Sequence, residues 1–306
     1  MKETAEPFLP PGLKPGDTIG LAAPAGPVRD RTAYNEGVRF LEAAGYRVKA
    51  PPDIFRQEDY LAGSDRERAR RFTEIWCAPE VQAVLAVRGG YGCLRLLPLL
   101  DLKLLAASPK LLIGFSDLTV LLNELGRRLG LITWHAPMLN TLTRCDTESR
   151  NSFLALLAGQ PAREIRAAAI RILRPGRGQG RLIGGNLACL SHLLGTPHEP
   201  DWPGAVLFLE DTGEPLYRVD RMLTHLERAG CLKKLAGLLL GSFTNGKGED
   251  EPWTDLVWNR VLEVAGDDYP VWGNFPAGHA SRNLSLPLGA MTVMDSASGS
   301  LVFPGF

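Results

Sequence analysis

Hydrophobic and polar positions follow two different periods along the first half of the chain. Short apolar runs that suit strands lie at 17–23, 46–50, 81–87 and 110–115, and amphipathic stretches that suit helices lie at 31–44, 65–77 and 118–128. Strands that alternate with helices of about 10 to 15 residues favour βαβ units, and therefore a mostly parallel sheet with helices on both faces. Ligands of such sheets bind beyond the carboxyl ends of the strands, so candidate site residues are expected where these runs end.

The second half of the chain has a different pattern. The segment Arg171–Arg181, RILRPGRGQGR, is rich in Gly, Pro and Arg and lacks apolar periodicity, which is typical of a linker. Beyond it, a buried-looking run at 205–211, a helical pattern at 217–230 and late runs such as AMTVMD and LVF indicate a mixed, strand-rich domain. We therefore predict an α/β protein in three parts: an N-terminal domain with a flavodoxin-like parallel sheet (1–160), a linker (161–180) and a smaller mixed α/β domain (181–306).

Composition and charge narrow the class of protein. The 306 residues are enough for roughly two domains, and 34 basic side chains balance 34 acidic ones. A formal net charge of zero gives no indication of a nucleic-acid partner or an anionic membrane surface. Residues 1–20 contain acidic side chains and prolines where a signal peptide has an apolar core, and no apolar stretch approaches about 18 residues. We therefore expect a cytoplasmic protein without a membrane partner.

The cysteines and histidines give no pattern of metal ligands. The five cysteines are scattered and never form a C-x-x-C pair: Cys77, Cys93, Cys145, Cys189 and Cys231. This spacing indicates buried, reduced thiols rather than a disulfide framework or a zinc ribbon. There is no H-E-x-x-H and no pair of histidines at i, i+4, so we expect neither a metal nor a cofactor.

A Ser-Asp pair stands at the turn between an apolar run and a helical pattern. In KLLIGFSDLTVLL the run ends at Gly114 and the chain turns through Ser116 and Asp117. A nucleophilic serine is best presented on such a strand-to-helix turn, where backbone N–H groups point at the developing oxyanion. The hydrolase elbow is G-x-S-x-G, however, and Leu118 replaces the last glycine here. From this segment alone, Ser116 is either a helix N-cap or a nucleophile.

A glycine-rich turn, VRGGYG (87–92), follows the apolar run VQAVLAV. Glycines at such a position allow backbone N–H groups to approach a phosphate or an oxyanion closely. The motif is not a P-loop, because no G-K-[ST] follows, and it is not G-x-G-x-x-G. A plain tight turn and a ligand-binding turn both fit this segment.

A nucleophilic serine needs a base and an acid that orients the base. His279 lies in the glycine-containing loop FPAGHASRN, where a side chain can face a cleft, and His135 at the end of a strand-like run is a reserve candidate. Glu210 and Asp211 both qualify as the acid, because the strand-like VLFLE runs straight into DTGEP. The alternatives are a surface histidine and a carboxylate that caps the next turn.

Several motifs, taken together and in order, resemble those of the LD-carboxypeptidases, the serine peptidases that include murein tetrapeptide carboxypeptidase and the microcin self-immunity peptidases. The motifs are RGGYG, GFSDLTVL, GGNLACL, LFLEDTGEPLYRVDRML, LAGLLLGSF and GHASRNLSLPLGA. The resemblance covers nearly the whole chain, from GDTIGLAAPAG to LPLGA. Several independent motifs in one order are far more specific than any one of them.

The resemblance implies a Ser-Glu-His triad made of Ser116, Glu210 and His279, drawn from both predicted domains. It also implies an oxyanion hole formed by the backbone N–H groups of Gly90 and Asp117. The reaction that it implies is hydrolysis through an acyl-enzyme without a metal or cofactor. A homodimer is the oligomeric state that it suggests.

The substrate that the resemblance implies is a murein tetrapeptide, cut in peptidoglycan recycling between the L-centre of a diamino acid and the terminal D-Ala. Microcin-type members carry an aromatic-rich insertion for a nucleotide, and the short segment Arg171–Arg181 has no Trp, which favours the murein peptide. Two alternatives stay open: a microcin C-type peptidyl-nucleotide hydrolase, and a non-catalytic α/β ligand-binding protein. The preferred diamino acid, meso-diaminopimelate or lysine, is also open.

An exopeptidase must recognise the free carboxylate at the end of its substrate, and a bidentate arginine suits this task. Four arginines lie close in sequence to the site motifs: Arg88, Arg218, Arg221 and Arg282. Each of them equally fits a structural ion pair, so the sequence does not select one.

Overall fold

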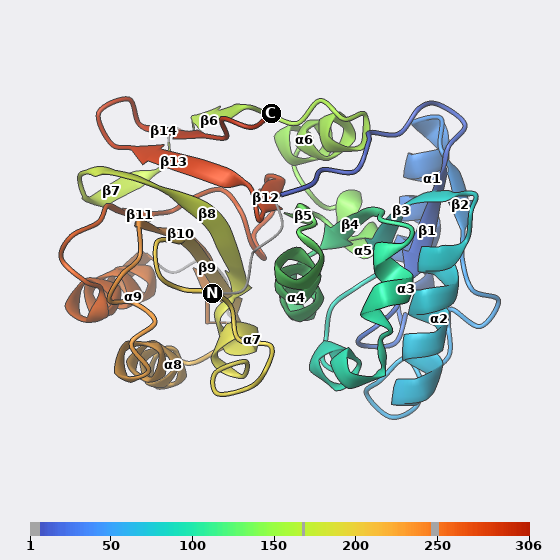
Figure 1. Ribbon diagram of the computed structural model, residues 1–306, viewed down its shortest axis with the longest axis horizontal. Coiled ribbons are helices and arrows are strands. Elements are labelled where there is room, and N and C mark those ends of the chain that lie inside the picture. The colour runs from blue at the N-terminus through green and yellow to red at the C-terminus, as the bar shows by residue number, and fades with distance from the viewer. Residues whose placement is uncertain (1–6, 167–168, 246–250) are drawn as a thin grey trace. The chain divides into compact units, whose positions relative to one another are not determined.

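The computed structural model describes residues 7–166, 169–245 and 251–306. The chain divides into two compact units, each built around its own sheet (Figure 1). The first unit comprises Met1–Pro161 with Leu284–Pro287, and the second comprises Ala162–Asn283 with Leu288–Phe306. No helix in the described part of the chain is long and apolar enough to cross a membrane.

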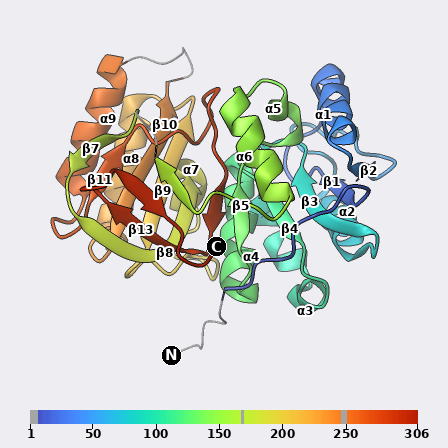
Figure 2. The same ribbon diagram turned by 90° about the horizontal axis from the view of Figure 1, so that it is seen from above.

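The first unit contains a six-stranded sheet in the order β12-β5-β4-β3-β1-β2. Its strands are β1 (Thr18–Ala22), β2 (Arg47–Lys49), β3 (Val81–Ala86), β4 (Leu111–Gly114), β5 (Thr133–His135) and β12 (Leu286–Leu288). The strands from β5 to β2 pair in parallel and lie side by side in this order in Figure 2. The predicted parallel sheet of the N-terminal half is therefore confirmed, and a strand from near the end of the chain completes it.

Helices cover this sheet because their apolar faces match it. They are α1 (Arg31–Ala43), α2 (Asp65–Cys77), α3 (Leu102–Ala106), α4 (Thr119–Leu129), α5 (Leu139–Leu142) and α6 (Thr147–Leu157), with short 3₁₀ helices η1 (Cys93–Arg95), η2 (Leu97–Leu99) and η3 (Ser116–Leu118). Helix α2 begins at a capping box in which Ser64 and Glu67 satisfy each other's backbone N–H groups. It packs against β1 and β3 through a buried face that includes Phe72, Ile75 and Trp76.

The second unit contains a mixed eight-stranded sheet in the order β6-β14-β13-β8-β9-β10-β11-β7. The strands are β6 (Glu164–Arg166), β7 (Arg171–Arg174), β8 (Arg177–Asn186), β9 (Val206–Thr212), β10 (Gly237–Thr244), β11 (Val271–Gly273), β13 (Met291–Asp295) and β14 (Ser300–Val302). The four strands from β8 to β11 are parallel, and the outer strands pair antiparallel. Helices α7 (Leu187–Ser191), α8 (Leu216–Arg228) and α9 (Glu251–Val264) lie together on one side of the parallel strands (Figure 1). The prediction of a mixed, strand-rich second half is confirmed.

The segment that we predicted to be a linker forms strands of this sheet. Residues 161–180 include β6, β7 and the start of β8. The inward-facing positions at the start of β8 are glycines, so the alternation of the strand is not visible as hydrophobicity. A Cβ atom on Gly178 would lie 1.7 Å from the carbonyl oxygen of Ala236, and one on Gly180 would lie 2.0 Å from that of Gly204. Glycine is therefore required here by close packing of the backbone and does not indicate a flexible connection.

Candidate active site

Ser116 lies directly after β4, on a sharp turn into the helical segment that becomes α4. Phe115 is extended, with φ of −157°, and Ser116 then has a φ of 62°, in the left-handed region that non-glycine residues rarely adopt. Such a backbone costs about 1–2 kcal/mol. The N-cap positions of η3 and α4 belong to Phe115 and Leu118, so Ser116 occupies neither of them. The turn has the strand-to-helix geometry of a nucleophile elbow without its second glycine.

The glycine-rich turn after β3 packs directly against this serine. A Cβ atom on Gly89 would lie 2.7 Å from both the Cβ and the Oγ of Ser116, so no other residue fits there without moving the serine. The next residue, Gly90, has a φ of 124°. The Gly26 N–H donates to the Gly89 carbonyl oxygen at 3.1 Å and supports the turn from the side of the loop after β1. The two segments singled out in the sequence therefore lie together in the first unit.

The Asp117 side chain ties the serine turn to the glycine-rich turn. Its Oδ2 accepts the backbone N–H of Cys93 at 2.8 Å, and both residues are buried, with 5% and 0% exposed surface. Cys93 follows the glycine-rich turn and begins η1. Asp117 therefore links, through its side chain, the two loops from which we predict the oxyanion donors.

In the second unit, a buried Glu210 and a partly exposed His279 form a hydrogen-bonded pair. Glu210 lies near the carboxyl end of β9 and is fully buried, whereas the His279 side chain is 20% exposed in the loop after β11. The distance from His279 Nδ1 to Glu210 Oε2 is 2.6 Å. Burial alone would lower the pKa of His279, but the charge of Glu210 and its hydrogen bond outweigh burial and raise the pKa above its ordinary value. This hydrogen bond fixes the orientation of the ring through Nδ1.

The loop that carries His279 is held on both sides. Gly278 has a φ of 123°, and a Cβ atom there would lie 2.4 Å from Ser242 Oγ and 3.1 Å from Glu210 Cβ. The Gly278 N–H donates to Asn283 Oδ1 at 3.0 Å, and the Ala280 N–H donates to Ser242 Oγ at 3.3 Å. These contacts hold the backbone on both sides of His279.

The neighbouring carboxylate, Asp211, has a different role in the fold. Its Oδ2 accepts the Ala188 N–H at 2.8 Å and its Oδ1 accepts the Thr212 N–H at 2.7 Å, so it fixes the start of α7. Burial, together with the charge of Glu210, raises the pKa of Asp211 to about 7. Glu210 and Asp211 were equal candidates in the sequence, and in the structure Glu210 is the one that contacts the histidine.

The reserve histidine lies in the core of the first unit. His135 ends β5 with no exposed surface, and its ring lies 5.6 Å from the ring of Phe115. A side chain without exposed surface cannot meet a substrate or a bulk water molecule.

In residues 7–166, 169–245 and 251–306 we find no group of three or more His, Cys, Asp or Glu side chains that could hold a metal ion.

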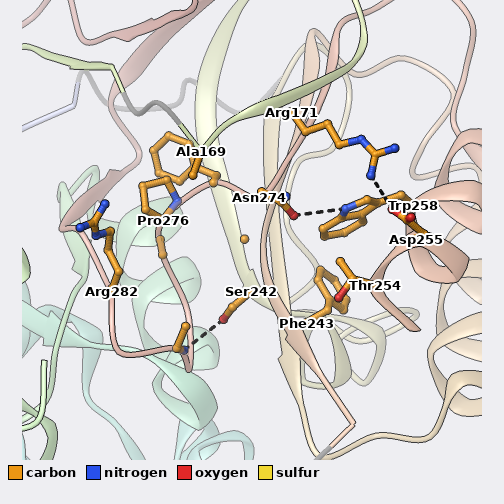
Figure 3. Close-up of a pocket in the computed structure, with 14 residues that line it drawn as sticks. Ala169, Arg171, Ser242, Phe243, Thr254, Asp255, Trp258, Asn274, Pro276 and Arg282 are labelled. Carbon is orange, nitrogen blue, oxygen red and sulfur yellow. Dashed lines mark hydrogen bonds and ion pairs between the residues drawn. The ribbon is translucent and has the colours of Figure 1, made fainter. Parts of the chain in front are cut away.

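A cavity of about 430 Å³ opens beside the His279 loop, entirely within the second unit (Figure 3). Ala277 and Ala280, on either side of His279 in the chain, line it, and so does Ser242. The opposite wall carries Arg171 and Asp255, which form an ion pair. Apart from Arg282, the sequence analysis did not single out the individual residues of this cavity.

The four candidate arginines are separated by the structure. Arg282 lines the cavity. Arg88 donates to the Pro27 carbonyl oxygen at 3.1 Å, Arg218 pairs with Glu214 at 3.4 Å, and Arg221 lies over the ring of Tyr217. Arg282 is therefore the candidate that borders the loop of the histidine.

A serine on a strained strand-to-helix turn and a histidine paired with a buried glutamate are the components of a serine-type hydrolase. Residues 19–136 match the LD-carboxypeptidase N-terminal domain, and residues 179–294 match the LD-carboxypeptidase C-terminal domain. The chain belongs to the LD-carboxypeptidase family of serine peptidases. The alternative of a non-catalytic binding protein is therefore set aside.

Relatives and solved structures agree over nearly the whole length. A putative carboxypeptidase from Streptomyces coelicolor is 37% identical, with 95% of this chain and 94% of the relative covered. A probable murein peptide carboxypeptidase from Bacillus subtilis is 35% identical, with 96% and 94% covered. The structure of muramoyltetrapeptide carboxypeptidase from Oxalobacter formigenes is similar, with a TM-score of 0.80, 32% identity and coverage of 93% and 97%. The microcin C7 self-immunity protein MccF, in complex with glutamyl sulfamoyl guanosine, gives a TM-score of 0.85 at 27% identity, with 97% and 98% covered.

Proposed function

We propose that the protein is a murein peptide carboxypeptidase that removes the terminal D-Ala from tetrapeptides in cytoplasmic peptidoglycan recycling. The observation that carries the proposal is the hydrogen bond of 2.6 Å between the buried Glu210 and His279, which orients a histidine as a base. The names of relatives that are at least 32% identical, a murein peptide carboxypeptidase and a muramoyltetrapeptide carboxypeptidase, support the substrate.

In the proposed mechanism the base acts through Nε2, because Nδ1 of His279 is held by Glu210. Nε2 removes the proton of the Ser116 hydroxyl, and Oγ attacks the carbonyl carbon of the diamino acid. Glu210 stabilises the imidazolium that forms. The imidazolium then protonates the nitrogen of the departing D-Ala, and water hydrolyses the acyl-enzyme by the same steps.

The developing oxyanion is assigned to the backbone N–H groups of Gly90 and Asp117. Three observations support this assignment: the φ of 124° at Gly90, the φ of 62° at Ser116, and the contact of Gly89 with the serine side chain. Each such donor contributes about 3–4 kcal/mol to transition-state stabilisation.

The test is release of D-Ala from a murein tetrapeptide by the purified enzyme, with and without a chelator. We expect chelator-resistant release that falls by about 10⁶-fold in Ser116→Ala, because the triad loses its nucleophile. Ser298→Ala, in a surface turn of the second unit, is the matched control and retains full activity. Unchanged activity in Ser116→Ala would rule out the mechanism.

A peptidyl-nucleotide substrate is the second candidate, favoured by the similarity to the self-immunity protein MccF. A processed microcin C incubated under the same conditions separates the two. We expect D-Ala release from the tetrapeptide to exceed cleavage of the microcin. Faster cleavage of the microcin than release of D-Ala would change the proposed substrate but not the proposed triad.

A further inference from the structure

Two exposed tyrosines lie side by side next to the glycine-rich turn of the first unit. Tyr91 follows Gly90 in this turn, and Tyr60 lies in the loop between β2 and α2. Tyr60 is 55% exposed and Tyr91 is 51% exposed, and their ring centroids are 6.0 Å apart at an interplanar angle of 50°. The rings do not cover each other, so together they present aromatic surface to solvent beside the proposed oxyanion donor Gly90.

Tyr60 is presented at the tip of a tight turn. Glu58 and Leu61 exchange two backbone hydrogen bonds, each of 2.9 Å, and Asp59 and Tyr60 form the tip between them. Asp59 has a φ of 53°, in the left-handed region that such two-residue tips require. Leu61 at the base of the turn is buried, so the turn is anchored in the first unit while its tip holds Tyr60 in solvent.

A buried arginine joins the two segments that carry the tyrosines. Arg68 is 1% exposed, its Nε donates to the Gly63 carbonyl oxygen at 3.2 Å, and its Nη1 donates to the Gly92 carbonyl oxygen at 3.1 Å. A Cβ atom on Gly92 would lie 2.8 Å from Leu61 Cδ2, so the glycine-rich turn packs closely on the base of the tight turn. The spacing of the two rings is therefore set by buried contacts and not by a chance meeting of surface side chains.

A charged pair borders the two rings. Arg95 donates through Nε to Asp65 Oδ2 at 3.0 Å, and the two side chains are 40% and 28% exposed. The hydrogen bond to Asp65, with smaller effects of Tyr60 and Tyr91, raises the pKa of Arg95, so its guanidinium lies near both tyrosines. Aromatic faces with a charged donor and a charged acceptor at their border suit a sugar ring. Its C–H groups pack on the negative face of an aromatic ring, and its hydroxyl and amide groups bond to the charged side chains.

We propose that Tyr60 and Tyr91 bind the amino sugar to which the amino end of a murein peptide is attached. The inference rests on the proposed function, in which Ser116 attacks the bond before the last residue of a tetrapeptide. Three residues then separate the cut bond from the sugar, and they span roughly 10 Å when extended. Tyr91 directly follows Gly90, at a Cα spacing of about 3.8 Å, so its ring lies within reach of the amino end of such a peptide.

Two substrates that contain the same tetrapeptide test this site: the free peptide, and the peptide attached to N-acetylmuramic acid. Release of D-Ala from each is measured for the wild-type enzyme, Tyr60→Ala, Tyr60→Phe and Tyr91→Ala. Phe8→Ala is the matched control, because Phe8 is an aromatic residue of the same unit that is 47% exposed and lies beside Leu131.

We expect the wild-type kcat/KM for the muramoyl peptide to exceed that for the free peptide by about 10-fold or more, since each aromatic contact contributes about 3- to 10-fold. Tyr60→Ala lowers kcat/KM for the muramoyl peptide by about 3- to 10-fold, through KM, and leaves the free peptide unchanged. Tyr60→Phe retains the ring and most of the preference. Tyr91→Ala lowers the ratio of the two kcat/KM values to a similar extent, whatever it does to the neighbouring Gly90. Phe8→Ala changes neither substrate.

Equal wild-type kcat/KM for the two peptides, or an equal loss on both in Tyr60→Ala, would overturn the assignment. Conversion of a dimer to a monomer in Tyr60→Ala, with an unchanged ratio of the two substrates, would assign the tyrosines to a contact between copies of the chain and would also overturn it.

Absence of D-Ala release from both peptides would instead reject the proposed function. In that case calorimetry with Ser116→Ala decides the binding question separately. Tighter binding of the muramoyl peptide than of the free peptide, lost when Tyr60→Ala is added, supports the sugar site, and equal binding rejects it.

Discussion

The carboxylate of Asp117 offers a sharp test of how the two loops around Ser116 are held together. Asp117→Ala removes the acceptor of the Cys93 N–H at 2.8 Å and leaves that buried donor without this partner. A hydrogen bond to a charged group contributes about 1.5–3 kcal/mol, so we expect a loss of stability of that size. For a unit of this length each kcal/mol corresponds to about 2–4 °C in Tm.

The effect on catalysis is expected to exceed what the loss of stability alone produces. Without the tie to Cys93 the glycine-rich turn moves, and with it the proposed donor Gly90. Loss of one oxyanion donor lowers kcat by about 10²- to 10³-fold. KM changes little, because the oxyanion forms only in the transition state. Asp117→Asn keeps an acceptor oxygen and recovers most of kcat.

Steady-state kinetics and thermal unfolding of both variants provide the measurement. Asp101→Ala is the control: Asp101 accepts the N–H groups of Lys103 and Leu104 at the start of α3, so its loss lowers Tm and leaves kcat unchanged. A wild-type kcat in Asp117→Ala, at a temperature where the variant is folded, would refute the reasoning.

Three further predictions concern the contact of Gly89 with Ser116, the pH dependence of the reaction and the oligomeric state. In Gly89→Ala the new methyl group would lie 2.7 Å from Ser116 Oγ. We therefore expect the rate at which a fluorophosphonate labels Ser116 to fall by about 100-fold or more. A labelling rate equal to that of the wild-type enzyme would show that the contact is not tight. The pKa of His279 is raised above its ordinary 6.5 by Glu210, outweighing burial, so kcat/KM falls with decreasing pH through a pKa above 6.5 as the base is protonated. Glu210→Gln removes that charge and moves the acid limb of the pH profile to lower pH while reducing kcat; a limb that stays in place would mean that another group titrates. The predicted homodimer would sediment at about twice the 33.3 kDa of one chain, and a single species of 33.3 kDa would exclude it.

The parts of the fold that the sequence predicted well are those in which side chains carry the pattern. In the first unit, the apolar runs and the amphipathic helix over Asp65–Cys77 agree with β1 to β4 and α2. The start of β8 could not be recognised in the same way, because its inward positions are Gly178 and Gly180. Glycine fits these positions because it has no Cβ atom. In the sequence, however, a glycine-rich segment is equally typical of a turn or a linker.

The candidate site was predictable only in part, for a similar reason. The position of Ser116 between a strand and a helix allowed a nucleophile or an N-cap, but no local pattern reports its φ of 62° or its close packing against Gly89. The pairing of His279 with Glu210 joins residues 69 positions apart, and that of Arg171 with Asp255 joins residues 84 positions apart. Spacing along the chain contains no information on such pairs. The residues offered His279 as a base with Glu210 or Asp211 as its acid, the resemblance to a family selected Glu210, and nothing led to the second pair.

The strand β12 has a consequence for how the first unit is made. It comes from Leu286–Leu288 and lies next to β5, although the rest of that sheet is complete by His135. During synthesis, about half of the chain is made between β5 and β12, so the edge of the sheet at β5 lacks its neighbouring strand until late in translation. Bare sheet borders recruit strands from other molecules. A gene cut after residue 161 would yield a first half with this border permanently open, so the sheet of the first unit is completed only by a segment made near the end of the chain.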